Sequence, residues 1–247
     1  MNLRSFGLAA LPTLLLPALT GCFEQVPSQE VTTGAMFQNV ELVSRDGLST
    51  DVGVELTVGC PLGTSVELQS GDQLRVSAFG QTVTLVKQDE LFGGSRYVGT
   101  MPHASEGAAF SVDYLRGDAS AQAQSCGRTS AVGTFALMAK PFEIAPVIVN
   151  AHLGQPVTLA WSNRDSGAMQ IAVSGSCIVG GHAMVGDAGA FVIDAGILAS
   201  ENAKERSACI VTAVVSRCRA GQVSPEFGEG GHVKACQERT IAFRIAP

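Results

Sequence analysis

The sequence predicts an all-β protein built from two β-sandwich domains in tandem. Short runs of alternating apolar and polar residues recur about every 8 to 12 residues, which is typical of sandwich strands. Gly, Asp, Asn and Ser separate these runs, as they do in turns. No window before Ala139 sustains a helical period with caps. We therefore expect a first sandwich over residues 36–140 and a second over 141–247, after an N-terminal leader.

The first sandwich contains several strand patterns. Residues 52–58 alternate strictly between apolar and small or polar side chains. Residues 74–76 and 83–85 each follow a turn-like sequence, which predicts a hairpin. Residues 110–114 alternate around Ser111 and Asp113, and residues 129–138 form a final β-rich run. Each of these patterns indicates a strand with one buried face.

Pro141 and Pro146 lie between β-like segments, and we place the junction between the two domains there. Residues 195–206 fit either a short helix or a polar crossover loop. The runs 209–215 and 240–245 are expected to be the last two strands and to pair antiparallel. Earlier strands of the second domain are expected at 156–161, 169–173 and 191–193.

The segment order PVTLAW, MQIAV, DAGAFVI and CIVTAVV in the second block is similar to that of adhesive surface modules. Each block resembles an immunoglobulin or fibronectin module, which implies an immunoglobulin-like β-sandwich. The chain departs from the family pattern because no Trp lies between Cys60 and Cys126, and because Trp161 precedes Cys177. These departures leave the strand order open.

Residues 1–21 have the layout of an export signal, with Arg4 followed by an apolar run and small residues. The run over 6–19 would span about 21 Å as a helix, against about 30 Å for a bilayer core, which argues against a transmembrane helix. It ends in Leu19-Thr20-Gly21-Cys22, which resembles a bacterial lipobox. This resemblance implies a lipoprotein signal peptide over 1–21 and diacylglyceryl and palmitate groups on Cys22. An ordinary leader with an unmodified cysteine is the alternative.

The residues after Cys22 bear on location. In lipoproteins of two-membrane bacteria an aspartate at the second position favours the inner membrane, and this chain has Phe23 there. The resemblance therefore implies the outer membrane, with its periplasmic or surface face undetermined. The segment is rich in Ser, Thr, Gln and Glu, so we expect residues 22–35 to be a lipidated tether that holds the body off the bilayer.

Seven cysteines are present, and assigning Cys22 to lipid leaves six. An even set in an exported chain indicates disulfides, because the compartment is oxidising. No pair has the C-x₂-C spacing of a metal site, so we expect no metal bound through cysteine. Six cysteines allow about 15 pairings. We favour the pairing that keeps each bridge within one domain: Cys60–Cys126, Cys177–Cys209 and Cys218–Cys236.

Composition excludes some functions. The formal net charge is −6 and no Lys/Arg cluster is present, which argues against a nucleic-acid partner. Motifs of common hydrolases, metalloproteases and phosphate-binding loops are absent, so we expect no catalytic residues and no cofactor. Apolar residues make up 46% of the chain and charged residues 15%, which is enough apolar sequence for a sizeable core.

Two histidines provide an alternative function. His182 and His232 each follow a pair of glycines, and together with Asp187 and Glu229 they could form a zinc or copper site. That arrangement would make the second domain a metal-binding protein or an enzyme. Surface histidines with no ligand role are the simpler interpretation.

The 17 residues between Cys218 and Cys236 form the most distinctive stretch of the mature chain. Loops longer than about 12 to 15 residues are uncommon and often functional. Phe227, with Glu229 and His232, is a candidate exposed anchor for a partner. The alternative is that Phe227 folds back with Val223 as a plug over the end of a sandwich.

We therefore expect a non-catalytic, membrane-anchored envelope lipoprotein with a binding, adhesive or assembly role. Its partners would be the lipid bilayer, through Cys22, and an envelope or surface protein or a glycan. The alternatives are the metal-dependent function around His182 and His232 and a purely structural spacer.

Overall fold

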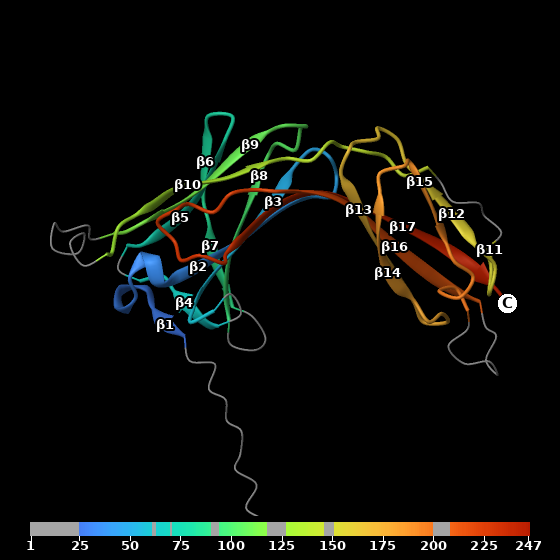
Figure 1. Ribbon diagram of the computed structural model, residues 1–247, viewed down its shortest axis with the longest axis horizontal. Helices are drawn as coiled ribbons and strands as arrows, with labels where there is room; N and C mark the ends of the chain where they lie inside the picture. Colours follow the sequence, from blue (N-terminus) through green and yellow to red (C-terminus); the bar gives the residue numbers. More distant parts are fainter. Residues whose placement is uncertain are drawn as a thin grey trace, which may run out of the picture.

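Figure 1 shows the computed structural model, which describes residues 25–60, 63–69, 71–89, 94–117, 127–145, 151–199 and 208–247. In these ranges the regular structure is strand, apart from two single-turn 3-10 helices, η1 (Ser28–Glu30) and η2 (Thr33–Ala35). Two sandwiches stand at the ends of an arched molecule, and each encloses its own hydrophobic core.

The first sandwich has two facing sheets. One sheet runs in the order β2 (Met36–Ser44), β3 (Thr50–Val58), β8 (Ser95–Met101), β7 (Val86–Asp89). The other runs β10 (Ala131–Leu137), β9 (Ala109–Leu115), β5 (Gln73–Ala78), β6 (Gln81–Thr84). These orders correspond to A-B-E-D and G-F-C-C′ of an immunoglobulin domain. The short strand β4 (Thr64–Glu67) pairs antiparallel with the end of β3, and β1 (Val26–Pro27) pairs parallel with β4.

The second sandwich has a large and a small sheet. The large sheet runs β11 (Ala151–His152), β17 (His232–Ala246), β16 (Cys209–Ala220), β13 (Ala168–Gly175), β14 (Gly181–Gly186). The small sheet pairs β12 (Val157–Ala160) with β15 (Ala190–Ile193). The arrangement corresponds to A-G-F-C-C′ facing B-E. The prediction of two immunoglobulin-like β-sandwiches is therefore confirmed.

The hairpin of β16 and β17 joins the two sandwiches. Its strands contain 12 and 15 residues, and they run in Figure 1 from the second sandwich into the first. Residues 232–237 of β17 pair parallel with residues 39–44 of β2, while the other edge of residues 234–237 pairs with β16. A single sheet of 11 of the described strands consequently crosses the junction.

This pairing corrects the expected 17-residue loop between Cys218 and Cys236. β16 continues to Ala220 and β17 begins at His232, so only residues 221–231 connect the two strands. The sequence around Lys234 reads as loop, but β17 gains hydrogen-bonding neighbours on both sides there, with Lys234 opposite Ala220 on β16 and Glu41 on β2.

Apart from the hairpin tip, residues before the linker form the first core, and residues in and after the linker form the second. The first core draws on residues 31–138, and the second on residues 142–215 together with Phe243 and Ile245. Phe142 in the linker is fully buried in the second core. However, Phe227, Val233 and Ala235 belong to the first core. The proposed division after residue 140 therefore leaves the tip of the hairpin on the wrong side.

The start of the described chain corrects the expected tether. Val26 pairs with Val66, and Val31 is buried in the first core. Thr33 donates its backbone N–H to the carbonyl of Gly127 at 3.0 Å. The prediction of a free tether is therefore wrong from Gln25 onward, because backbone pairing and burial fix this polar segment.

Several sequence predictions concern residues that the structure does not describe. The signal peptide over 1–21 and the lipidated Cys22 lie outside the described residues, as do residues 200–206 of the helix-or-loop segment. Residues 195–198, at its start, form turns. In the described part of the chain no helix is long and apolar enough to cross a bilayer.

Candidate functional site: a groove on the shared sheet

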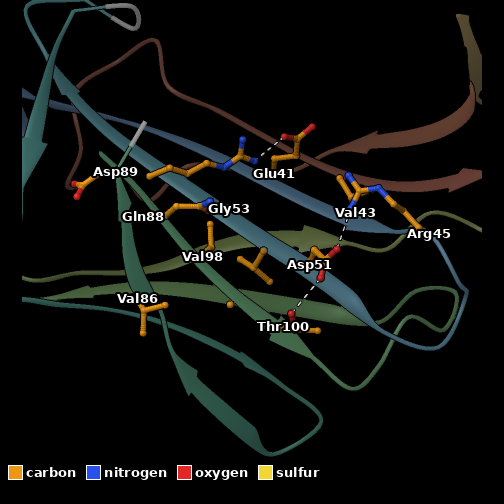
Figure 2. A pocket seen from close by; sticks show the side chains of 13 residues that line it. Glu41, Val43, Arg45, Asp51, Gly53, Val86, Gln88, Asp89, Val98 and Thr100 are labelled. Atoms are coloured by element: carbon orange, nitrogen blue, oxygen red, sulfur yellow. Dashed lines mark hydrogen bonds and ion pairs between the residues drawn. The ribbon is translucent and has the colours of Figure 1, made fainter. Parts of the chain in front are cut away.

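A groove of about 810 Å³ lies on the solvent face of the first sandwich. Alternation along the strands creates this face, because Val40 and Leu42 of β2 point into the core and their neighbours point outward. Figure 2 shows side chains from β2, β3, β7 and β8 converging there. Apart from the core residue Val52, the lining consists of Glu41, Val43, Arg45, Asp51, Gly53, Val86, Gln88, Asp89, Arg96, Val98, Gly99 and Thr100.

Gly53 forms part of the floor of the groove. It lies in the middle of β3, opposite Glu41 on β2 and Val98 on β8. A Cβ at this position would clash with the guanidinium group of Arg96. The missing side chain lets Arg96 extend across the strand and pair with Glu41 at 2.9 Å. A glycine inside a strand often marks such a close approach.

The charges around the groove are already paired with one another. Glu41 lies between Arg96, at 2.9 Å, and Lys234, at 2.8 Å. Burial works to raise the pKa of Glu41, but hydrogen bonds from Lys234 and Arg96 outweigh burial and lower it. Arg45 contacts Asp51 at 2.9 Å and Glu238 at 3.0 Å.

The polar side chains of the groove are largely engaged with one another. The lining contains no His, Cys, Ser or Lys, and its hydroxyl, on Thr100, donates to Asp51 at 3.1 Å. Asp51 is also paired with Arg45 at 2.9 Å. Carboxylate, amide and guanidinium groups together can bind a neutral polar ligand such as a peptide backbone or a row of hydroxyl groups.

A second groove of about 400 Å³ lies on the same face of the shared sheet, over the second sandwich. Its lining includes His182 and Met184 from β14, with Gln170 from β13. Glu238 connects the two grooves, since it pairs with Arg45 beside the first and accepts a hydrogen bond from Ser216 beside the second. The outer face of the shared sheet thus carries both grooves and crosses the domain junction.

The structure contradicts the metal site proposed around His182 and His232. His182 lies opposite Ala172, and the register across β16 places it level with Thr240 on β17. His232 lies eight residues before Thr240, about 26 Å along the strand at about 3.3 Å per residue. Across the described residues no group of three or more His, Cys, Asp or Glu could hold a metal ion.

Asp187 has a structural role in place of the proposed ligand role. Its side chain is fully buried and lies 2.6 Å from Nη2 of Arg217. It also accepts hydrogen bonds from the indole N–H of Trp161 at 2.7 Å and from the backbone N–H of Asp165 at 2.8 Å. Arg217 in turn packs over the ring of Phe142, so this ion pair ties the linker to the second core.

Phe227 is a plug and not an exposed anchor. It is 6% exposed and stacks on Tyr114, with 6.0 Å between ring centroids. The exposed-anchor interpretation is therefore wrong for Phe227, because the hairpin tip turns this ring into the first core. Glu229 and His232 are exposed beside it. Their role in binding a partner stays a prediction.

Two of the three predicted disulfides are present. Cys177 bonds to Cys209 and Cys218 bonds to Cys236. Cys60 is exposed and bonds to none of the described cysteines. Its proposed partner Cys126 lies outside the described residues, so that bridge stays a prediction.

Comparison with known proteins finds no matching family model and no matching curated protein. Among solved structures, the FN1–FN3 domains of chicken CNTN1 are 13% identical at a TM-score of 0.30, covering 91% of this chain and 70% of that chain. A two-domain fibronectin type III segment of chicken tenascin is 11% identical at a TM-score of 0.22, with coverages of 86% and 99%. The central fibronectin III array of RIM-binding protein is 12% identical at 0.26, with coverages of 85% and 86%.

Similarity at this level carries no argument about function. The strand orders and the groove define the class of this molecule: a tandem immunoglobulin-like β-sandwich protein with an open groove, lined by valines and paired charges, on a sheet shared by both domains. This class is compatible with a binding or structural role. The groove was not predicted from the sequence, although Gly53 inside a strand pattern is a signal of such a close approach.

Proposed function

We propose that this protein is a lipid-anchored envelope protein that binds an envelope or surface partner through the groove, without catalysis. The observation that carries the proposal is the groove itself, in which Gly53 opens the sheet surface and the charged side chains are paired in advance. Fixed polar groups in a concave site favour orientation-specific binding.

The anchoring part of the proposal rests on the lipobox-like sequence that ends at Cys22. Two or three acyl chains bind a bilayer firmly, whereas one chain binds reversibly. Phe23 after the cysteine supports the outer membrane as the location. The partner is a protein segment or a glycan that offers hydrogen-bonding groups and little charge, since a charged ligand would have to displace an existing ion pair.

A capture experiment with matched variants tests the groove. A soluble chain that begins after Cys22 is used to capture partners from native envelope, alongside Gly53→Val and Gly186→Val. A valine at 53 displaces the flexible end of Arg96 and fills the floor, whereas a valine at 186 meets open space on β14. We expect Gly53→Val to lose a partner that the other two chains retain. Identical partners for all three would contradict binding through the groove and favour a structural spacer.

A further inference from the structure

The hairpin tip of the second domain, residues 221–237, completes the first domain. Residues 232–237 cover the outer edge of β2, which would otherwise be the edge strand of its sheet. Phe227, Val233 and Ala235 from the tip are buried in the first core. The first domain therefore receives a strand and a core plug from a segment that follows it by about 90 residues.

Further contacts fix the tip at its far end. Ser224 donates its backbone N–H to the hydroxyl of Thr134 at 2.9 Å and its own hydroxyl to the carbonyl of Val132 at 2.8 Å. Gly228 donates its backbone N–H to the carbonyl of Met36 at 2.8 Å. Both sheets of the first sandwich therefore contact the tip, one through β10 and the other through β2.

The Cys218–Cys236 bridge lies at the base of this tip. The two residues face each other across β16 and β17. Cys236 also lies opposite Val43 of β2, so the bridge is placed where the β16–β17 hairpin enters the first domain. On the other side, Ala213 and Val215 of β16 are buried in the second core. The bridge thus marks the point at which the hairpin passes from one core to the other.

We propose that residues 221–237 act as a strap locked by the Cys218–Cys236 bridge, and that opening the bridge releases the strap and uncovers the β2 edge. A dithiol reductant supplies two electrons and two protons, leaving two cysteine thiols and the oxidised reductant. Cys218 is half-buried and Cys236 buried, so Cys218 is the sulfur open to attack. The uncovered edge would present unpaired backbone groups, which accept a strand from another chain.

Hydrogen exchange on the whole soluble chain tests the strap. The samples are the oxidised chain, the chain folded oxidised and then treated with dithiothreitol, and Cys218→Ala/Cys236→Ala. Cys177→Ala/Cys209→Ala, with and without the reductant, is the matched control for the other bridge. We expect β2 and residues 221–237 to exchange on the order of 100-fold faster without the Cys218–Cys236 bridge, the factor that closing a loop of this length implies in the chain-entropy model.

The control pair should keep slow exchange in β2 until it is reduced. Amides of β13, which lie in the second domain, report that each variant is folded. Unchanged exchange of β2 in Cys218→Ala/Cys236→Ala, with β13 protected, would overturn the lock. Faster exchange of β2 in the control pair before reduction would also overturn it, because the effect would not be specific to this bridge.

Discussion

Two phenylalanines, one in the hairpin tip and one on the strand beside it, have opposite surroundings. Phe227 is 6% exposed in the first core, whereas Phe135 on β10 is 53% exposed. Truncating a buried phenylalanine removes its transfer free energy and leaves a cavity. We therefore expect Phe227→Ala to lower the free energy of unfolding by about 3 kcal/mol, measured by urea denaturation.

Phe135→Ala is the matched control, because it removes the same atoms from an exposed position on a neighbouring strand. We expect its effect to stay within about 0.5 kcal/mol of zero. Equal losses for the two variants would contradict the plug.

Asp46 lies in the turn between β2 and β3 and is the centre of a local hydrogen-bond cluster. Its carboxylate accepts the backbone N–H groups of Ser49 and Leu48 and the hydroxyl of Ser49, each at 2.8 Å. These bonds favour the charged form, and that of the Ser49 N–H does most to lower the pKa, from 3.8 to about 2.

The sign of the pH effect follows from the lowered pKa. The carboxylate stabilises the turn fully above its ordinary pKa, and the contribution is lost as the pH falls from about 4 toward 2. A carbon-13 NMR titration of the Asp46 carboxyl should give a midpoint near 2. Ser49→Ala removes the hydroxyl donor and should move the midpoint upward, whereas a midpoint near 3.8 in the unaltered chain would contradict the cluster.

At the scale of elements, one arginine holds the N-terminal segment against the first sandwich. Arg116 donates to the carbonyls of Ser28 and Val31, both at 2.7 Å, and pairs with Asp72 at 3.0 Å. Both members of the ion pair are buried. Arg116→Met should cost about 3 to 5 kcal/mol, because it leaves a buried carboxylate without its cation.

The same variant should also release residues 25–35, which limited proteolysis would detect as early cleavage. Arg116→Met/Asp72→Leu separates the two effects: we expect stability to recover while the cleavage persists, since the carbonyls of Ser28 and Val31 still lack their donor. Arg75→Met, whose guanidinium contacts only the side chain of Gln73 among the hydrogen bonds described, serves as the control. A segment that stays protected in both Arg116 variants would contradict this role.

The strands that sequence alone predicted share a local signal. The alternation over 52–58, 110–114 and 169–173 falls within β3, β9 and β13, and the hairpin at 74–85 is β5 with β6. Strands with no such alternation were missed. The exposed strand β14, from Gly181 to Gly186, is one example.

The sheet shared by the two domains was also missed, because it pairs strands that are far apart in the sequence. β17 pairs with β2 across about 190 residues, and nothing in the sequence near Lys234 or Glu41 specifies that partner. The groove could not be assembled for the same reason, since its walls come from four strands whose register only the fold defines. The disulfides Cys177–Cys209 and Cys218–Cys236 were predictable because each joins cysteines that are close in sequence and lie within one predicted domain.

At the scale of the whole molecule, the anchoring proposal makes a simple prediction. Cys22→Ala should leave the protein exported but move it from the membrane fraction to the soluble fraction, because the remaining chain has no acyl groups. Cell fractionation followed by immunoblotting measures this. Cys60→Ala should stay with the membranes, and a Cys22→Ala protein that remains there equally well would overturn lipidation as the anchor.

The chain reaches the first sandwich only a few residues after Cys22, so very little free chain separates the sandwich from the proposed acyl groups. Gln25 is already placed next to Lys87, and it follows Cys22 by only three residues. Even a fully extended chain covers about 10 Å over that interval. A lipidated form would therefore stand with its first sandwich against the headgroups. Because no long flexible linker would extend its reach, it would bind only partners that come as close to the bilayer as the protein's own dimensions.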